Sequence, residues 1–389
     1  MTQKQVQSVP KGRCPLSRKC GGCQLQNMEY ERQLKYKQEK VISLLGKFCR
    51  VSPIVGMKDP YHYRNKVQAA FGLTRGRQVI SGVYQSSTHK IVNVDSCQIE
   101  HPAADRIVVT IRRLLPQFGI LPYNEDSRQG FLRHVLVRRG HHSGQIMVVL
   151  IGANPIFPTK KRFTQELLRL HPEITTLVLN INSKSTSMLL GDREEVLYGN
   201  GYIEDTLCDC VFRISPRSFY QINSVQTEKL YSKAIELAGL TGKERVLDAY
   251  CGIGTIGLIA APKAAQVVGV EVNGDAVRDA KVNAACNNIR NAHFIKADAG
   301  EYMVELAQSG EAVDVVFMDP PRAGSDLPFL NSVLALSPQR IVYISCNPET
   351  QARDLRTLVK GGYKVTYLQP FDMFPHTAHI ESLVCLVKK

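Results

Sequence analysis

The pattern of apolar and polar positions changes near residue 214. From there to the end of the chain, short apolar runs of strand length alternate with amphipathic stretches of helix length. This alternation predicts a mostly parallel sheet with helices packed on its faces. The predicted strands are 245–249, 266–270, 292–295, 313–318, 340–344, 364–368 and 382–387. The predicted helices between them are 256–261, 276–288, 300–308, 327–336 and 348–359.

The last two predicted strands, 364–368 and 382–387, are joined by a loop alone, which predicts an antiparallel hairpin at the end of the sheet. Residues 214–389 are therefore expected to form an α/β, Rossmann-like, doubly wound sheet. A sheet of this kind that ends in a hairpin is the usual shape of methyltransferases that use S-adenosylmethionine (SAM).

The chain before residue 214 has a different pattern. Apolar runs at 131–139 and 145–151 flank a Gly-His-His-Ser-Gly turn, which predicts a hairpin, and 106–115 and 161–170 are typical of covering helices. We therefore expect a mixed α+β central domain over 58–213. The preceding segment, 1–57, combines a Cys/Gly-rich turn with a helix over about 24–48.

Charge and cysteine usage narrow the class of protein. The net charge is +14, and residues 1–50 contain eleven Lys or Arg against three Asp or Glu, which favours a nucleic-acid partner over a merely solvated basic face. The eleven cysteines follow a polar N-terminus without a signal-like apolar run, so a disulfide framework is not expected. No apolar run approaches the ~18 residues of a membrane span. A cytoplasmic protein is expected, and no obligate protein partner is evident.

A cofactor pocket is predicted where the strand 245–249 runs into a glycine-rich turn. Gly252 and Gly254 allow a sharp turn and the close approach of a ligand. Glu271 ends the next strand and can accept hydrogen bonds from both ribose hydroxyls, and Asp298 follows the third strand, where it can meet an adenine edge. No Gly-x-Gly-x-x-Gly triplet supplies a pyrophosphate clamp, so a nucleoside cofactor without phosphates is favoured over NAD. An ordinary turn is the disfavoured alternative.

The segment Asp-Pro-Pro-Arg ends the fourth predicted strand. Its prolines stiffen the backbone into a rigid lip where a transferred methyl group can meet its acceptor. A related lip occurs in enzymes that methylate exocyclic amines, so Asp319 and its neighbours alone leave the acceptor open. Arg322 can contact an RNA phosphate or pair with a carboxylate, and both readings stay open.

A cysteine nucleophile and a carboxylate base distinguish between these acceptors. Cys346 follows the strand 340–344 and precedes a predicted helix, whose dipole favours a thiolate. Carbon 5 of uracil is a poor nucleophile until a thiolate adds to carbon 6, and Glu381, at the start of the last strand, is the best candidate to remove the carbon 5 proton. A buried, inert thiol is the alternative for Cys346. His376 and His379 lack a third metal ligand nearby, which favours structural or substrate-contacting roles.

These motifs resemble the RNA uracil-5-methyltransferase family over essentially the whole chain. The resemblance implies that Cys346 is the nucleophile and Glu381 the base. It also implies that the N-terminal helix packs on the methyltransferase domain. The SAM-contacting residues implied by the resemblance include Gln221, in a Phe-x-Gln-x-Asn stretch, together with Tyr250, Glu271 and Asp319.

The N-terminal cysteines resemble a motif of the 23S ribosomal RNA branch of this family. Cys14, Cys20, Cys23 and the more distant Cys97 match its four ligands. Four thiolates bind zinc or a [4Fe–4S] cluster, and the spacing leaves both open; the resemblance implies the iron–sulfur cluster, in a structural or RNA-positioning role. Only 13 residues precede Cys14, so the β-barrel (TRAM) module of many members is expected to be absent, as in the shorter ribosomal RNA enzymes.

The function expected from the sequence is SAM-dependent methylation of carbon 5 of one uridine in 23S ribosomal RNA, within a single-stranded loop from which the base can be extruded. Two alternatives remain: the same chemistry on transfer RNA, which the cysteine motif disfavours, and a non-catalytic iron–sulfur protein that binds RNA. The second alternative requires a vestigial SAM pocket, whereas all of the expected pocket and catalytic residues are present.

Overall fold

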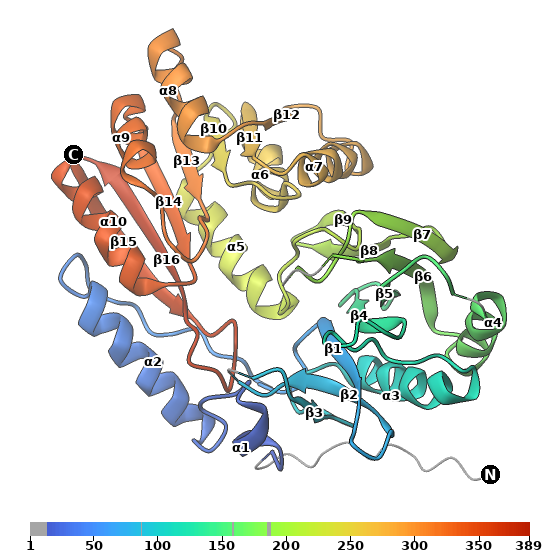
Figure 1. Ribbon diagram of the computed structural model, residues 1–389. Helices are drawn as coiled ribbons and strands as arrows, with labels where there is room; N and C mark the ends of the chain where they lie inside the picture. The colour runs from blue at the N-terminus through green and yellow to red at the C-terminus, as the bar shows by residue number, and fades with distance from the viewer. Residues whose placement is uncertain (1–13, 87, 158, 185–187) are drawn as a thin grey trace. The chain divides into compact units, whose positions relative to one another are not determined.

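The computed structural model describes residues 14–86, 88–157, 159–184 and 188–389 (Figure 1). Two compact units are formed. The first contains the described residues up to Asn27 together with Pro60–Asp205 and Ile214–Pro216, and the second contains Met28–Asp59, Thr206–Arg213 and Arg217–Lys389. Among the described helices, none is long and apolar enough to cross a membrane.

The first unit is built on a seven-stranded sheet with the order β3-β2-β1-β4-β5-β6-β7. Every neighbouring pair is antiparallel except β5 and β6, whose parallel pairing needs a crossover that α4 supplies. The core lies between the sheet and the helices α3 and α4, and β5 is buried along its whole length. The bounds are α1 Ser17–Cys20, β1 Lys66–Leu73, β2 Val79–Tyr84, β3 Ile91–Asn93, α3 Pro102–Gln117, β4 Leu132–Arg139, β5 Ile146–Gly152, α4 Lys160–Leu170, β6 Ile174–Ile181 and β7 Arg193–Tyr198.

The hairpin and the two covering helices predicted in this region are confirmed as β4–β5, α3 and α4. The strands β6 and β7 were not predicted. Most of β7 is exposed, without the alternation of buried and exposed positions that marks a strand in a sequence. A further two-stranded sheet, β8 (Ile203–Leu207) and β9 (Cys210–Ile214), lies where the chain passes from the first unit to the second.

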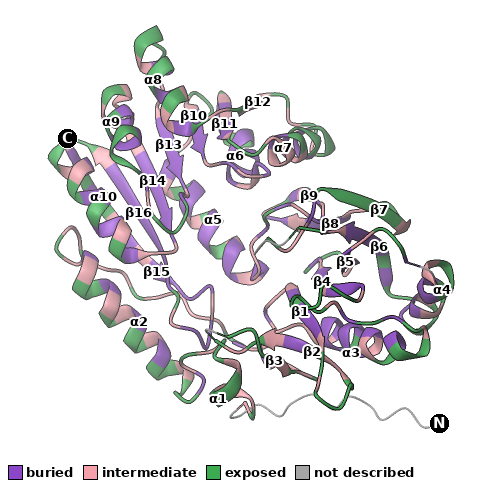
Figure 2. Ribbon diagram, viewed as in Figure 1, coloured by how far each residue is buried: buried purple, intermediate pink, exposed green. Residues whose placement is uncertain are grey.

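The second unit is a doubly wound α/β sheet with the order β12-β11-β10-β13-β14-β16-β15, as the sequence predicts. The strands β10 to β14 are parallel, and β16 inserts antiparallel between β14 and β15. Figure 2 shows that its central strands are buried. The bounds are α2 Tyr30–Leu45, α5 Ser224–Ala238, β10 Arg245–Ala249, α6 Thr255–Ala260, η1 Ala261–Lys263, β11 Gln266–Glu271, α7 Gly274–Cys286, β12 Ala292–Lys296, α8 Ala299–Ser309, β13 Val315–Met318, α9 Leu327–Leu336, β14 Arg340–Ser345, α10 Pro348–Lys360, β15 Tyr363–Phe371 and β16 Glu381–Lys388.

Helix α5 was not predicted, although its ends carry ordinary signals. The side chain of Asn223 caps its N-terminus by accepting from the Gln226 amide, and Gly239 ends it in the left-handed conformation that glycine adopts without strain. The helix lies against β14 and β16. It therefore belongs to the layer that covers the part of the sheet where the candidate nucleophile and base lie.

Helix α2 groups with the second unit, which differs from the predicted N-terminal segment 1–57 and from the predicted boundary near 214. Its buried positions are Gln33, Lys37, Val41 and Leu45, which form one stripe along the helix. That stripe packs against β15 and α10, and Figure 1 shows the blue helix beside these orange-red elements. The cysteine turn and the helix therefore lie in different units, and the expected packing of the N-terminal helix on the methyltransferase domain is confirmed.

Candidate active site

The strand register brings Cys346 and Glu381 together. Ser345 at the end of β14 pairs with Ser382 on β16, so Cys346 and Glu381 are the next residues at this end of the antiparallel pair. Residues opposite one another in such a pair have Cβ atoms roughly 4.5–5.5 Å apart. The Ser382 hydroxyl donates to Gln351 Oε1 at 2.6 Å and to the Ser345 carbonyl at 3.4 Å, which fixes this register from the side of α10.

The surroundings of Cys346 disfavour a resting thiolate. Burial raises the pKa of Cys346 to about 11, the carboxylates of Glu381 and Asp319 act in the same direction, and Arg322 acts in the opposite direction. Helix α10 begins two residues later, as expected, with the Asn347 side chain accepting from the Glu349 amide. Burial therefore opposes the thiolate that the helix dipole is expected to favour.

Two acidic side chains share the space beside the thiol. Glu381 is buried, and burial together with the neighbouring Asp319 raises its pKa well above the ordinary value. Burial also raises the pKa of Asp319 to about 7. Two neighbouring buried carboxylates disfavour double ionisation. A carboxylate with a raised pKa is also a stronger base.

The lip after β13 is tied to the segment that carries the nucleophile. The backbone carbonyl of Arg322 accepts from the Asn347 side-chain amide at 3.2 Å and from the Thr350 hydroxyl at 3.4 Å. The Arg322 side chain is exposed, and its charge is felt at Cys346. These contacts place the lip next to the segment that carries the thiol, as the sequence predicts. The guanidinium group of Arg322 stays exposed to solvent.

Tyr231, which the sequence did not indicate, forms a hydrogen bond with Gln221. The charges of Asp319 and Glu381 also act on it. The Tyr231 side chain is buried and forms hydrogen bonds with the side chains of Gln221 and Thr255. Burial raises the pKa of Tyr231 well above its ordinary value, and the nearby carboxylates of Asp319 and Glu381 add to the effect. Tyr231 lies on α5, and neither this helix nor this residue was predicted from the sequence.

The glycine-rich turn after β10 has the shape expected of a ligand cradle. Tyr250, Gly252 and Gly254 all have positive φ, at 66°, 55° and 82°. A Cβ on Gly252 would meet no atom within 4 Å, whereas a Cβ on Gly254 would meet the Phe294 ring at 2.8 Å. Gly254 is therefore required for packing, while Gly252 borders open space where a ligand can approach.

The acidic residues at the following strand ends differ in role. Glu271 accepts from the Gly252 amide at 3.1 Å and from the Asn273 amide at 2.8 Å, so it stabilises the glycine-rich turn. Asp298 is exposed and caps α8, since its Oδ1 accepts from the Gly300 amide at 2.8 Å and also from the Glu301 amide. Both carboxylates lie beyond the carboxyl ends of parallel strands, the edge where ligands bind in such sheets.

Asp248 is a buried acid that the sequence reading passed over. It lies inside β10, is 1% exposed, and accepts from the Gly257 amide at 2.8 Å. Burial raises its pKa to about 7, and the carboxylates of Asp319 and Glu271 add to the effect. An acid in the middle of an apolar strand was the available signal, because such a position is costly unless it has a purpose.

The four candidate metal ligands lie in the first unit. Cys14 acts electrostatically on Cys20 and Cys23, and Glu100 acts on Cys20, Cys23 and Cys97. Burial raises the pKa of Cys23 to about 12. Within residues 14–86, 88–157, 159–184 and 188–389, no group of three or more His, Cys, Asp or Glu is arranged to hold a metal ion. The metal site therefore stays a prediction.

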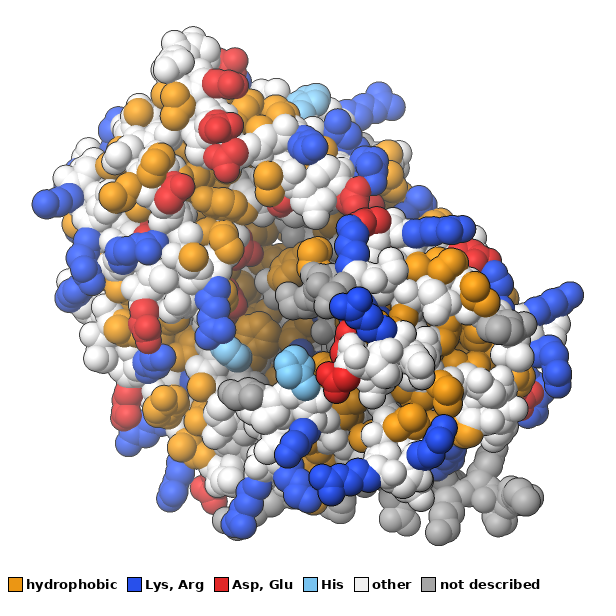
Figure 3. All heavy atoms as spheres, in the orientation of Figure 1, with side chains coloured by type: hydrophobic (Ala, Val, Ile, Leu, Met, Phe, Trp, Pro, Cys, Tyr) orange, Lys and Arg blue, Asp and Glu red, His pale blue; other side chains and the backbone are white. Residues whose placement is uncertain are grey.

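The two histidines of the loop that precedes Glu381 differ in exposure. His376 is buried and contacts Gln33, whereas His379 is exposed. In the view of Figure 3, Lys and Arg side chains are spread over the face rather than gathered in one patch. Residues 1–13 of the predicted basic segment lie outside the described residues.

Comparisons with known proteins agree with this geometry. A model of the tRNA (uracil-5-)-methyltransferase family matches residues 29–389. An uncharacterized RNA methyltransferase of Halalkalibacterium halodurans is 45% identical over 381 residues, which cover 97% of this chain and 83% of that protein. An uncharacterized RNA methyltransferase of Bacillus cereus is 44% identical over 378 residues, covering 96% of this chain and 82% of that protein.

A solved structure is similar over most of the chain. The tRNA (uracil-54, C5)-methyltransferase of Pyrococcus abyssi, in complex with S-adenosyl-L-homocysteine, has a TM-score of 0.79 and 29% identity, covering 94% of this chain and 86% of that one. Family and fold together support a methyltransferase that uses SAM and acts on RNA. The chain belongs to the RNA uracil-5-methyltransferase family.

Proposed function

We propose that this protein methylates carbon 5 of a uridine in 23S ribosomal RNA, with Cys346 as nucleophile and Glu381 as base. The observation that carries the proposal is the adjacency of these two residues beyond the Ser345–Ser382 pair, with Asp319 beside them. Methylation of an exocyclic amine would need neither a thiol nor a base at this place.

The proposed reaction proceeds in two stages. In the first, the Cys346 sulfur bonds to carbon 6 of the uracil, and the electron pair of the carbon 5–carbon 6 double bond moves onto the ring carbonyl. Carbon 5 of this enolate then attacks the methyl group of SAM, the bond between that methyl group and the sulfonium sulfur breaks, and S-adenosylhomocysteine is the leaving group. In the second stage Glu381 removes the carbon 5 proton, the double bond re-forms, and the bond between sulfur and carbon 6 breaks.

The electrostatics of the site match these two tasks. The raised pKa of Glu381 makes it a strong base for the second stage. The thiol of Cys346 is protonated at rest and needs a cation nearby or a proton acceptor when substrate binds, and Arg322 already acts in that direction. Asp319, whose carboxylate acts on Cys346, is proposed to accept that proton, so that Glu381 stays available for the second stage.

The residues proposed to hold SAM surround the carboxyl ends of the parallel strands. Gln221 forms a hydrogen bond with Tyr231, and the charge of Asp319 acts on the same tyrosine. Gly252 borders the open space beside the turn, and Glu271 holds the amide of Gly252. The remaining two proposed contacts come from the ring of Tyr250, which packs on Phe329 at 5.1 Å between centroids, and from the exposed Asp298.

The choice of ribosomal RNA rests on the cysteine motif. We infer that Cys14, Cys20, Cys23 and Cys97 hold a [4Fe–4S] cluster in the first unit, with a structural or RNA-positioning role, because the methyl transfer needs no electron. The electrostatic effect of Glu100 on Cys20 and Cys23 and also on Cys97, which is distant from them in the sequence, supports this assignment. The target is proposed to lie in a single-stranded loop, where the base can leave its stack. The cytoplasmic location expected from the sequence stays a prediction.

Transfer RNA is the second candidate substrate, since the Pyrococcus abyssi enzyme of similar structure acts on uracil 54 of transfer RNA. Mass mapping of RNA from cells with and without the gene separates the two. Loss of a 5-methyluridine from large-subunit ribosomal RNA is the expected result. Loss from transfer RNA alone would replace the proposed substrate, and unchanged RNA of every class would favour the non-catalytic alternative.

A further inference from the structure

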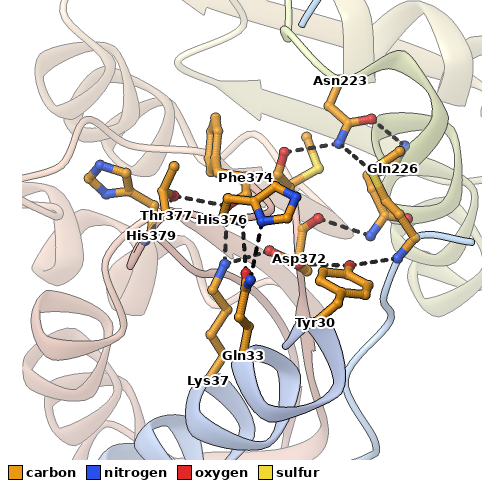
Figure 4. Close-up of polar contacts among 12 residues, drawn as sticks. Tyr30, Gln33, Lys37, Asn223, Gln226, Asp372, Phe374, His376, Thr377 and His379 are labelled. Atoms are coloured by element: carbon orange, nitrogen blue, oxygen red, sulfur yellow. Dashed lines mark hydrogen bonds and ion pairs between the residues drawn. The ribbon is translucent and has the colours of Figure 1, made fainter. Parts of the chain in front are cut away.

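Helix α2 directs three polar side chains toward the loop that precedes Glu381. This loop, residues 372–380, joins β15 to β16. Figure 4 shows Tyr30, Gln33 and Lys37 reaching from the helix to Asp372 and His376. Gln33 and Lys37 are fully buried, which is unusual for a lysine and costly for both residues unless their polar atoms are paired.

Asp372, the first residue of the loop, is held from two sides. Lys37 Nζ donates to Asp372 Oδ1 at 2.5 Å, and the Tyr30 hydroxyl donates to Oδ2 at 2.8 Å. Lys37 Nζ also donates to the Phe374 carbonyl at 3.1 Å, so the same ammonium group holds a second point of the loop. Burial lowers the pKa of Lys37, and the Asp372 carboxylate opposes that change.

His376, in the middle of the loop, is held by Gln33. The Gln33 side-chain oxygen accepts from the His376 backbone amide at 2.9 Å, and its nitrogen lies 3.1 Å from His376 Nδ1. His376 has a φ of 67°, a conformation that costs a residue with a side chain on the order of 1 kcal/mol. One amide group therefore fixes both the backbone and the ring of a strained residue.

The loop reaches the base through the strand register. Glu381 pairs with Phe371, the residue immediately before Asp372, so the two ends of the loop lie opposite one another. Helix α5 holds the same end, because Gln226 donates to the Asp372 carbonyl at 3.1 Å and Asn223 donates to the Met373 carbonyl at 3.0 Å. A shift of Asp372 or His376 is therefore transmitted to Glu381.

We propose that Tyr30, Gln33 and Lys37 are positioning residues for proton removal: through Asp372 and His376 they hold the loop so that Glu381 stays in line with carbon 5 of the methylated uracil. This inference rests on the proposed function, because it takes Glu381 as the base. The contacts act on the second stage of the reaction, since they touch neither Cys346 nor the residues proposed to bind SAM.

The stage at which the reaction slows separates positioning from mere packing. If Glu381 is misplaced, the methyl group is still transferred, but the bond between Cys346 and carbon 6 persists. The covalent protein–RNA adduct then accumulates and survives denaturation. A packing defect would instead weaken SAM binding and slow methyl transfer and product release together. A geometric error at a reacting group costs about tenfold to a hundredfold in rate.

The experiment compares Gln33→Ala and Tyr30→Phe with Gln38→Ala, using unmethylated ribosomal RNA from cells that lack the gene. Gln38 lies on the same helix but donates to the Ser52 carbonyl, so its variant tests the helix without touching the loop. Turnover, methyl transfer in a single turnover, SAM affinity and the denaturation-resistant adduct are measured. Tyr30→Phe removes one oxygen atom, which donates to Asp372 and also accepts from the Met57 amide at 2.9 Å.

The expected result is turnover slowed about tenfold in Gln33→Ala, with adduct accumulating and with SAM affinity and single-turnover methyl transfer within about twofold of the wild type. Tyr30→Phe should change in the same direction, and Gln38→Ala should match the wild type. Turnover and adduct levels equal to those of Gln38→Ala would overturn the proposal, and so would a parallel loss of SAM affinity and turnover.

Two reference proteins keep the failure of this proposal distinct from failure of the proposed function. Wild-type protein that transfers no methyl group to either ribosomal or transfer RNA would overturn both. Glu381→Gln that traps no adduct would remove Glu381 as the base and the positioning role with it. If Glu381→Gln traps the adduct and Gln33→Ala does not, the function stands and the positioning role alone is overturned.

Discussion

Lys37 and Asp372 lie 335 residues apart in the chain, yet their side chains form a 2.5 Å ion pair that is closed to solvent. Removing one member of such a pair leaves an uncompensated buried charge, which costs more than the pair itself contributes. Lys37→Met should therefore lower the free energy of unfolding by about 3–5 kcal/mol, as measured by urea titration followed by circular dichroism.

The matched control is Lys35→Ala. Lys35 lies on the same helix and pairs with Glu39 in solvent, so this change should alter the free energy of unfolding by less than about 1 kcal/mol. The double variant Lys37→Met, Asp372→Leu should recover most of the loss, because no charge is then left unpaired. A double variant as unstable as the single one would show that packing, rather than charge pairing, dominates at this place.

Cys346→Ala should abolish methylation while leaving SAM affinity within about twofold of the wild type, because the thiol is proposed to form the bond to carbon 6 and not to hold the cofactor. Methyl transfer to RNA and SAM binding by calorimetry are the two measurements. The exposed Cys286 supplies the control, since Cys286→Ala should retain full activity. Methylation by Cys346→Ala would remove the covalent mechanism.

The affinity for SAM should depend on Tyr231. Tyr231→Phe removes hydrogen bonds to Gln221 and Thr255, and the loss of such bonds at a buried site costs about 1–3 kcal/mol. SAM binding is therefore expected to weaken by about fivefold to a hundredfold. Tyr363→Phe is the comparison, because this buried hydroxyl donates at 2.7 Å to the Pro338 carbonyl, away from the turn. Equal effects of both variants on SAM affinity would contradict the assignment.

Asp248 should make stability depend on pH. Burial raises its pKa from 3.8 to about 7 in the folded protein, so the folded state binds the proton more tightly than the unfolded chain. The stability that this group contributes is complete below pH 4 and is lost as the pH rises through 7. Asp248→Asn should thus be more stable than the wild type at pH 8, by on the order of a few kcal/mol, with the difference vanishing near pH 4.

Urea titrations of both proteins at several pH values measure this difference. Asp314→Asn is a useful comparison because Asp314 lies at a strand edge, where it accepts from the Arg245 amide, and is only partly buried. An Asp248→Asn protein whose stability relative to the wild type does not change with pH would show that the pKa of Asp248 is the same in the folded and unfolded states.

The cysteine turn makes a prediction about metal content. Protein purified without oxygen should contain iron and sulfide, and Cys97→Ser should lower the iron content although Cys97 is far from the other three ligands in sequence. Cys49→Ser, which changes a thiol of the second unit, should leave the iron content unchanged. Zinc in place of iron would contradict the cluster while keeping the four ligands.

The strands of the second unit could be predicted because parallel strands buried on both faces appear as continuous apolar runs. The two helix positions that matter most could not. Gln33 and Lys37 look like solvent-exposed residues in any reading of apolar periodicity, and only their distant partners His376 and Asp372 make burial possible. Val41 and Leu45 continue the same stripe and mark an apolar face in the sequence, whereas the polar half of the stripe cannot be recognised without the loop.

Some residues of the candidate site could likewise be predicted from the sequence, and others could not. Cys346 and Glu381 could be paired from sequence, because each adjoins a recognisable strand. Tyr231 could not, since a tyrosine on an unpredicted helix gives no sign that it bonds to Gln221. The rise in the pKa of Cys346 also could not be predicted from the sequence, because it depends on burial and on two carboxylates that other strands contribute.

The position of Glu381 depends on the register in which β16 pairs with β14 and β15. Because side chains alternate between the two faces of a strand, a slip of β16 by one residue would turn Glu381 to the opposite face and bring Ser382 toward the thiol. A mispaired sheet would therefore carry the proposed nucleophile without the proposed base. By the proposed mechanism such a molecule would capture RNA without releasing it, so correct register matters for turnover as well as for stability.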